Sequence, residues 1–263
     1  MNTAKNGLGA STQGSTTSAL AFGGSVPPGT ALTESWDGTS WTEVADLATA
    51  RYDIGGSGTG NTSALAFAGG TPPRTAATEE WSFPSAPAVQ EGQMWIKTAT
   101  GTSSVMKGHQ AAGTGAWASG GSLNTARKGV GGGAVGTQTA SITAGGNISG
   151  ATAVSEQYNG TSWTEIAEMN SKINRGGGMR TTTDGLVASG LSPSTPGNVT
   201  FCEAWNGSSW TEVADLNTAR DGVSGAGTQT NGLAFGRDDA SGNTAATEEC
   251  DDPKLTLKTV DTD

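Results

Sequence analysis

The sequence predicts an all-β protein with the architecture of a β-propeller, and two observations support that prediction. One is a group of residues that recurs five times along the 263-residue chain, with a period of about 45 residues. The other is the content of each copy, which reads as four short strands joined by turns. A unit of this size cannot bury an apolar face alone, so neighbouring copies must pack together. Four-stranded units at this period are typical of propeller blades.

The first copy shows how the strands are expected to follow one another. Glycines in its first strand suit a crowded position where backbones approach closely. Gly23–Gly24 lets the chain leave the sheet after the second strand, and Asp37–Gly38 is a strong hairpin signal between the third and fourth. The four strands are expected at Asn6–Ser11, Ser18–Phe22, Leu32–Trp36 and Ser40–Ala45.

The chain is predicted to form a single domain, residues 1–263. Approximate repeats cover residues 1–50, 51–84, 127–174, 175–219 and 220–263. In the second, the glycine pair is placed at the end of Leu65–Gly70, and the fourth strand expected after Trp81 is missing. Leu255–Val260 alternates and could supply the last outer strand.

The segment 85–126 does not fit the repeat. Three strands are expected in it, at Gln93–Ala99, Ser103–Gln110 and Ala116–Gly120. They form either an irregular sixth blade or a hairpin insert in a five-bladed ring, and the sixth blade is favoured.

Composition excludes several classes of protein. The net charge of −10 disfavours nucleic-acid binding, which needs clustered Lys and Arg. No stretch is apolar and long enough for membrane insertion. Cys202 and Cys250 are too few for a disulfide framework, although a pair across adjacent units stays open. Eight Trp at recurring positions argue against disorder, because each buried indole removes much apolar surface from water.

The recurring aromatic and acidic residues are interpreted as architecture. Aromatic pairs that flank each turn are expected to pack between sheets: Trp36 with Trp41, Tyr158 with Trp163, and Trp205 with Trp210. Repeated carboxylates such as Glu43, Glu165 and Glu212 indicate a solvated face or a structural hydrogen bond, because a catalytic acid is usually needed only once. His109 is the only histidine, which removes multi-histidine metal sites. No cofactor is predicted. A calcium site could be built from Asp238, Asp239 and nearby carbonyls, or from Asp251 and Asp252, although neither pair has a specific loop spacing.

In order and spacing, these residues resemble the kelch repeat. Its hallmark is a strand ending in paired glycines, then an aromatic residue, then a tryptophan, then a basic residue near the next unit. Gly23–Gly24, Trp36, Trp41 and Arg51 fit that order, as do Gly145–Gly146, Tyr158, Trp163 and Arg175. One glycine of the pair is missing at Ser189–Gly190 and at Gly236–Arg237. The resemblance implies a kelch-like propeller.

Several phrases also resemble kelch-like repeats in virion proteins of marine bacteriophages: ALAF with GG, TAATEEW, NGTSWTEV and LNTAR. This resemblance implies a non-enzymatic structural or adhesive protein of a tail, neck or fibre, made in the cytoplasm of the bacterial host and located in the virion. The expected partners are other virion structural proteins and a polysaccharide of the host cell surface. A kelch-type protein–protein adaptor is the alternative. A glycan-processing enzyme that uses Glu79, Glu80, Glu248 and Glu249 is less favoured, because these residues sit at repeated positions.

Partner or glycan contacts are expected on the loops that follow the glycine pairs, because rigid sheets position variable loops there. Trp95, in the irregular segment, could anchor another virion subunit. The candidate residues are Arg74, Trp95, His109, Asn147, Asn198, Asp238 and Asp239.

Overall fold

A computed structural model describes most of the chain. The residues outside the description are 27, 72, 84–95, 98–104, 107–114, 131–133, 194–196, 229–230, 237, 240–241, 244–245 and 251–263. The expected strand at Leu255–Val260 therefore lies outside the described residues. No described segment is helical, and so no described helix could cross a membrane.

Antiparallel strands form five consecutive sheets, named here blades 1 to 5. Blade 1 contains β1 (Gly9–Ala10), β2 (Ala19–Phe22), β3 (Thr33–Trp36) and β4 (Trp41–Val44). Blade 2 contains β5 (Gly55–Gly58), β6 (Ser63–Phe67), β7 (Thr78–Ser82) and β10 (Ala116–Gly120). Blade 3 contains β11 (Ala134–Gly136), β12 (Ser141–Ala144), β13 (Ser155–Tyr158) and β14 (Trp163–Ile166).

The last two blades repeat this order. Blade 4 contains β15 (Gly177–Thr181), β16 (Asp184–Ser192), β17 (Gly197–Trp205) and β18 (Trp210–Val213). Blade 5 has three described strands, β19 (Ser224–Thr228), β20 (Asn231–Phe235) and β23 (Thr247–Cys250). Two further pairs of strands form small sheets of their own: β8 (Ile96–Lys97) with β9 (Val105–Met106), and β21 (Asp238–Asp239) with β22 (Gly242–Asn243).

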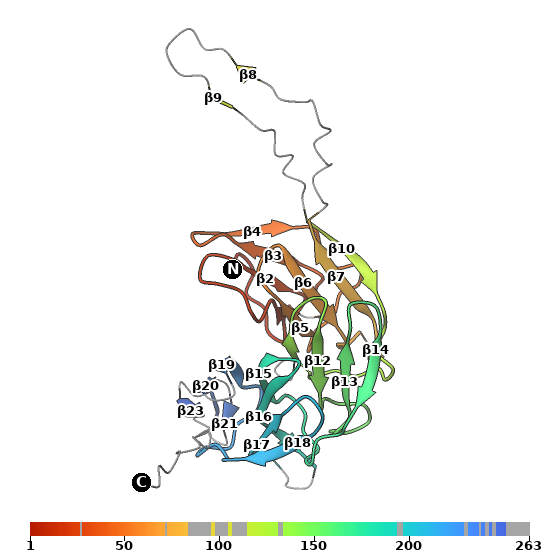
Figure 1. The fold of residues 1–263 in the computed structure, drawn as a ribbon, viewed down its shortest axis with the longest axis vertical. Helices are drawn as coiled ribbons and strands as arrows, with labels where there is room; N and C mark the ends of the chain where they lie inside the picture. Colours follow the sequence, from red (N-terminus) through yellow and green to blue (C-terminus); the bar gives the residue numbers. More distant parts are fainter. Residues whose placement is uncertain are drawn as a thin grey trace, which may run out of the picture.

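The five sheets are arranged as a five-bladed β-propeller, which confirms the predicted all-β fold class. The first strand of each blade is innermost and contacts the first strand of the next blade, from β1 through β5, β11 and β15 to β19. Figure 1 shows the sheets following one another around an arc, from blade 1 in red to blade 5 in blue. The strands β19 and β1, which would close the ring, do not form a comparable contact.

The preference for a sixth blade is not supported. Blade 2 has the strand order β10-β7-β6-β5, and β10 pairs with β7 along its whole length, with Trp117 opposite Trp81. The fourth strand that is missing after Trp81 is therefore supplied from beyond the extra residues. The extra residues interrupt blade 2 between its third strand, β7, and its fourth strand, β10. Figure 1 shows the separate β8–β9 hairpin at this point of the chain. Of the three expected strands, Ala116–Gly120 is confirmed, and β8 and β9 lie within the other two.

The predicted hairpins are confirmed with their register. Trp36 pairs opposite Trp41 across the Asp37–Gly38 turn, and the same opposition recurs for Tyr158 with Trp163 and for Trp205 with Trp210.

The predicted position of the glycine pair in blade 2 is wrong by one residue. Positive φ angles of 58–71° mark the first residue of each pair, at Gly23, Ala68, Gly145, Ser189 and Gly236. The pair in blade 2 is therefore Ala68–Gly69, and its first glycine is also missing.

Apolar side chains fill the junctions between neighbouring blades. Leu65 and Phe67 of blade 2 form one buried cluster with Val130, Tyr158 and Trp163 of blade 3. The Trp163 ring lies 4.9 Å from the Phe67 ring, centroid to centroid. Similar clusters occupy the junctions between blades 1 and 2, 3 and 4, and 4 and 5. The interpretation of the aromatic pairs as packing between sheets is thus confirmed for Tyr158 with Trp163 and for Trp205 with Trp210, whereas Trp36 and Trp41 belong to none of these clusters.

Cys202 is buried in one of these clusters, and its thiol donates to the Thr200 carbonyl at 3.6 Å. The side chain of Cys250 is outside the description, so the pairing that the sequence leaves open is not tested.

Candidate binding face

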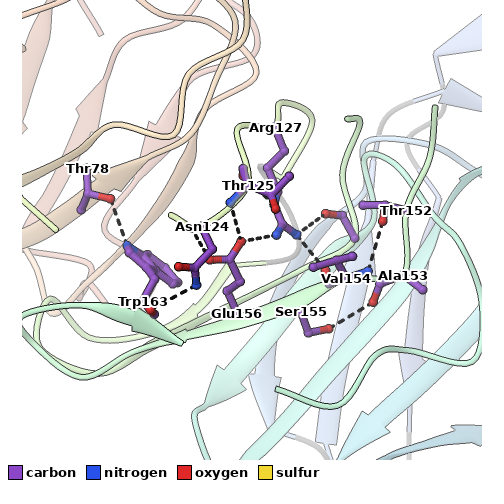
Figure 2. A network of polar contacts seen from close by, with 11 residues as sticks. Thr78, Asn124, Thr125, Arg127, Thr152, Ala153, Val154, Ser155, Glu156 and Trp163 are labelled. Carbon is purple, nitrogen blue, oxygen red and sulfur yellow. Dashed lines mark hydrogen bonds and ion pairs between the residues drawn. The ribbon is translucent and has the colours of Figure 1, made fainter. Parts of the chain in front are cut away.

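A buried ion pair lies at the start of blade 3 and shows how the strands of one repeat are joined (Figure 2). Arg127 precedes the inner strand and is completely buried. Its Nη1 donates to the carbonyls of Gly145 and Val154, at 3.1 and 2.7 Å, and its Nη2 donates to Glu156. One guanidinium thus ties together the ends of β12 and β13, the second and third strands of its blade.

The Glu156 carboxylate makes the second half of this contact. It accepts from the backbone N–H of Asn124 at 2.7 Å and of Thr125 at 3.4 Å. These residues belong to the link from blade 2, so the carboxylate joins that link to β13. Burial lowers the pKa of the Arg127 guanidinium, and the Glu156 charge opposes that shift.

The arrangement recurs in four of the five blades, which gives a structural role to the repeated basic residue. The pairs are Lys5–Glu34, Arg51–Glu79, Arg127–Glu156 and Arg220–Glu248. In blade 4 the basic position holds Ile173. Glu203 there accepts only from the backbone and side chain of Asn170 and from the backbone of Ser171 among the described residues. Glu79 and Glu248, two of the four acids considered for glycan processing, are thus engaged in these structural pairs.

Glu80, another of those acids, accepts a hydrogen bond from the Tyr158 hydroxyl of blade 3. Burial of the hydroxyl, together with the bond to Glu80, raises the pKa of Tyr158 to about 12. Tyr158 should therefore ionise late when the folded protein is titrated with base. Its contribution to stability is complete below about pH 10, where an unfolded tyrosine begins to ionise. As pH rises toward 12, this contribution is lost, because the unfolded chain loses the proton first.

Tyrosinate absorbance measured from pH 9 to pH 12.5 checks this expectation, with Tyr158→Phe as the reference. The late ionisation should disappear in the variant. Ionisation of Tyr158 near pH 10 while the protein is still folded would contradict the buried contact with Glu80.

The five links that enter the inner strands meet around the axis of the propeller. In each, the second residue after the basic position has a left-handed backbone, with φ of 50–69°, at Gly7, Asp53, Gly129, Arg175 and Gly222. Backbone hydrogen bonds connect successive links. The Gly129 N–H donates to the Asp53 carbonyl at 3.0 Å, the Arg175 N–H to the Gly129 carbonyl at 2.9 Å, and the Gly222 N–H to the Arg175 carbonyl at 2.8 Å. We call the segments 6–7, 52–53, 128–129, 174–175 and 221–222 the axial loops.

Two axial loops carry a side chain where the other three have glycine. The left-handed region is unfavourable for residues with a β-carbon, less so for Asp. Asp53 nevertheless adopts a φ of 50° and Arg175 a φ of 61°. Such backbone strain concentrates at functional sites.

The charged groups of the axial loops are only partly neutralised within the protein. Arg175 Nη1 lies 3.1 Å from the carboxylate of Asp221, which is buried. Lys128 Nζ lies 5.3 Å from the centre of the Tyr52 ring, a cation–π distance. No ion pair joins Lys128 or Asp53 to another described residue.

Two asparagines, Asn174 within an axial loop and Asn147 beside one, have side-chain oxygens that accept from no described donor. The Oδ1 atoms of Asn147 and Asn174 are both buried and accept no hydrogen bond within the described structure. Asn147 forms a backbone bridge with Lys128, and Asn174 Oδ1 lies so close to Gly129 that a β-carbon there would approach to 2.1 Å. Buried acceptors without a partner are costly, so both favour a hydrogen-bond donor from outside.

The loops after the glycine pairs border the axial loops. Backbone bridges join Asn6 to Ser25, Tyr52 to Gly70, Lys128 to Asn147 and Asn174 to Leu191. Of the seven candidate residues, Asn147 is therefore placed beside the axial loops. Arg74 is exposed and bridges to Gly70. Asn198 belongs to the β16–β17 hairpin and pairs opposite Leu191.

The remaining candidates are less well placed. Asp238 and Asp239 form β21, in the stretch between β20 and β23. Trp95 and His109 lie outside the described residues. Across the described part of the chain, no group of three or more His, Cys, Asp or Glu side chains could hold a metal ion.

Sequence reasoning missed the axial residues themselves: Tyr52, Asp53, Lys128, Arg175 and Asp221. A signal for them existed. Two residues after each repeated basic position, three copies have glycine, whereas the others have Asp53 and Arg175. In blade 4 the basic position is Ile173, so Arg175 is not the kelch-type basic residue that the sequence suggested.

No family model matches the chain, and no curated protein matches it.

Proposed function

We propose that this protein is a non-enzymatic structural and adhesive component of a bacteriophage virion, and that it binds a polar ligand through its axial loops. The ligand class we infer is a glycan of the host cell surface. One observation carries the binding proposal. The residues that hold the blades together recur from copy to copy, whereas the residues of the axial loops differ.

That contrast is visible within single repeats. The basic residue and its glutamate partner recur in four blades. The very next residue differs in most copies, being Asn6, Tyr52, Lys128, Asn174 and Asp221. Packing explains the repeated residues but not this variety, because the residue that follows each variable position has the same left-handed backbone in all five copies. Variable loops on a rigid scaffold are where binding residues usually lie.

The chemistry of the face suits a ligand with many hydroxyl groups. Lys128 and Arg175 offer donors, while Asp53 offers a carboxylate with no ion-pair partner among the described residues. The unpartnered oxygens of Asn147 and Asn174 add acceptors. A sugar hydroxyl both donates and accepts, so it can satisfy both kinds of group. Binding would relieve the cost of the two buried acceptors.

Placement in a virion rests on the resemblance to repeats of phage proteins. Other virion proteins are then the expected structural partners. Mass spectrometry of purified particles of the phage that encodes the chain tests this part directly. Absence of the protein from intact particles would contradict a virion role while leaving ligand binding to be judged separately.

Ligand binding is tested with a glycan array and the variant Asp53→Gly, which restores the residue found in three other copies. We expect retention of at least one glycan by the wild-type protein and a loss of about tenfold or more in the variant, the size of one hydrogen bond to a charged group. The variant should be at least as stable as the wild type, because glycine relieves the left-handed strain. Glu165→Gln, on the exposed outer strand of blade 3, is the charge-matched control and should bind normally.

Two results would contradict the binding proposal. One is silence of the wild-type protein on every glycan. The other is unchanged binding by Asp53→Gly, which would move the site away from the axial loops. Retention of a protein partner instead of a sugar would favour the adaptor alternative.

A further inference from the structure

The cationic side chains of the axial face come from two neighbouring loops, those that enter blades 3 and 4. Lys128 Nζ lies 5.3 Å from the centre of the Tyr52 ring, on the loop that enters blade 2. The Arg175 guanidinium reaches the other way, with Nη1 3.1 Å from the carboxylate of Asp221, on the loop that enters blade 5. The two side chains therefore diverge from loops that are themselves joined by a backbone hydrogen bond from Arg175 to Gly129.

The two buried acceptors without a partner lie at the same pair of loops. The Asn147 backbone is joined to that of Lys128 by two hydrogen bonds, of 2.7 and 3.1 Å. Asn174 directly precedes Arg175, and its Oδ1 is packed against Gly129. Neither side-chain oxygen accepts a hydrogen bond from a described residue. A ligand at these loops thus meets two oxygens that need donors, together with two cationic side chains.

Much of the positive charge at these two loops is available to a ligand. Lys128 has no ion-pair partner among the described residues. Arg175 contacts Asp221 through one guanidinium nitrogen, and its side chain is 39% exposed. The Asp53 carboxylate is directed elsewhere, because a β-carbon at Gly7 would lie 2.9 Å from its Oδ1. The negative charge of Asp53 is therefore placed beside the loop that enters blade 1.

The net charge of −10 does not exclude an anionic ligand here. Exposed charges separated by more than about 8 Å are largely screened from one another at physiological ionic strength. Glu165, an exposed acid, is on β14, the outermost strand of blade 3 and three strand spacings from the inner strand β11. Three spacings amount to about 14 Å. The cations beside the ligand therefore outweigh the acids of the outer strands.

We propose that the glycan bound by the axial loops is acidic. A sugar carboxylate lies between Lys128 and Arg175, and neighbouring hydroxyl groups donate to Asn147 and Asn174. This inference rests on the proposed function and adds to it the charge of the sugar and the two loops that select it. Arg175 offers paired N–H donors that match a carboxylate, and Lys128 adds a second positive charge. A neutral sugar satisfies the asparagine oxygens but leaves both cations to water.

The test uses the full chain and a panel of oligosaccharides of uronic acids, each beside its neutral, carboxyl-reduced form. The wild-type protein should bind at least one acidic member about tenfold more tightly than its reduced form, the size of one hydrogen bond to a charged group. Lys128→Gln should remove most of that difference and leave binding of the reduced form unchanged. Lys97→Gln, in the separate β8–β9 pair, is the charge-matched control and should bind both forms as the wild type does.

The possible failures of this inference differ from those of the proposed function. Equal binding of the acidic and reduced forms, or a preference for neutral sugars that Asp53→Gly still abolishes, would overturn the acidic ligand and leave the binding face in place. Preference for the acidic form that Lys128→Gln does not reduce would overturn the assignment to these two loops. Silence of the wild-type protein on every sugar would overturn both the acidic ligand and the binding of glycans.

Discussion

Replacing Glu156 by glutamine is expected to lower the free energy of unfolding by about 3–5 kcal/mol. The carboxylate is completely buried, and it accepts from both the Arg127 guanidinium and the link that enters blade 3. Glutamine keeps the size of the side chain but leaves the guanidinium as an uncompensated buried charge. Denaturant unfolding followed by tryptophan fluorescence measures the loss, because Trp163 is buried beside this network (Figure 2).

Two further variants separate the ion pair from other effects. Glu165→Gln changes an exposed carboxylate on the next strand, and it should alter stability by less than about 0.5 kcal/mol. Glu203→Gln changes the equivalent buried carboxylate of blade 4, where Ile173 replaces the arginine. Its effect should be clearly smaller than that of Glu156→Gln, because no buried guanidinium is left unpaired. Equal losses at Glu156 and Glu203 would show that the backbone contacts, and not the arginine, make the carboxylate important.

Local signals in the sequence predicted the strands well. A two-residue turn such as Asp37–Gly38 determines which residues face each other across a hairpin, so the pairing of Trp36 with Trp41 could be expected. The recurrence of the aromatic pairs likewise predicted packing between sheets. These features depend on residues close in the chain, and for that reason sequence patterns reveal them.

Pairing across a long separation was harder to predict. Trp117 of β10 pairs with Trp81 only after the extra residues of blade 2, and nothing local in β10 distinguishes a fourth strand from part of another blade. Register within the glycine pairs was also ambiguous, because Ala68 adopts the left-handed conformation usually reserved for glycine. Both errors arose where tertiary contacts override a local preference.

The candidate site, too, was predicted from the sequence only in part. Partner contacts were predicted on the loops after the glycine pairs, and the structure places Asn147, from one of these loops, beside the axial loops. The axial residues were missed because their positions look like part of the repeated framework. Only the fold shows that Asp53 and Arg175 belong to links joined in series by backbone hydrogen bonds around the axis.

Gly56→Ala is expected to destabilise the protein by about 3 kcal/mol, at the upper end for overpacking. Gly56 is buried in β5, where the inner strands of blades 1 and 2 meet. A β-carbon there would lie 2.5 Å from the carbonyl oxygen of Ala10 and 2.6 Å from its nitrogen. Both are backbone atoms of β1, so relief requires the two strands to move apart. Thermal and denaturant unfolding measure the cost.

Gly150→Ala provides the control, because a β-carbon at Gly150 would meet nothing within 4 Å. Its φ also lies outside the left-handed region, so alanine should be neutral or slightly stabilising through its lower unfolded-state entropy. Similar stability for the two variants would mean that β1 and β5 can separate without cost. Close approach of inner strands would then not hold the blades together, and the buried pairs and aromatic junctions would have to do so alone.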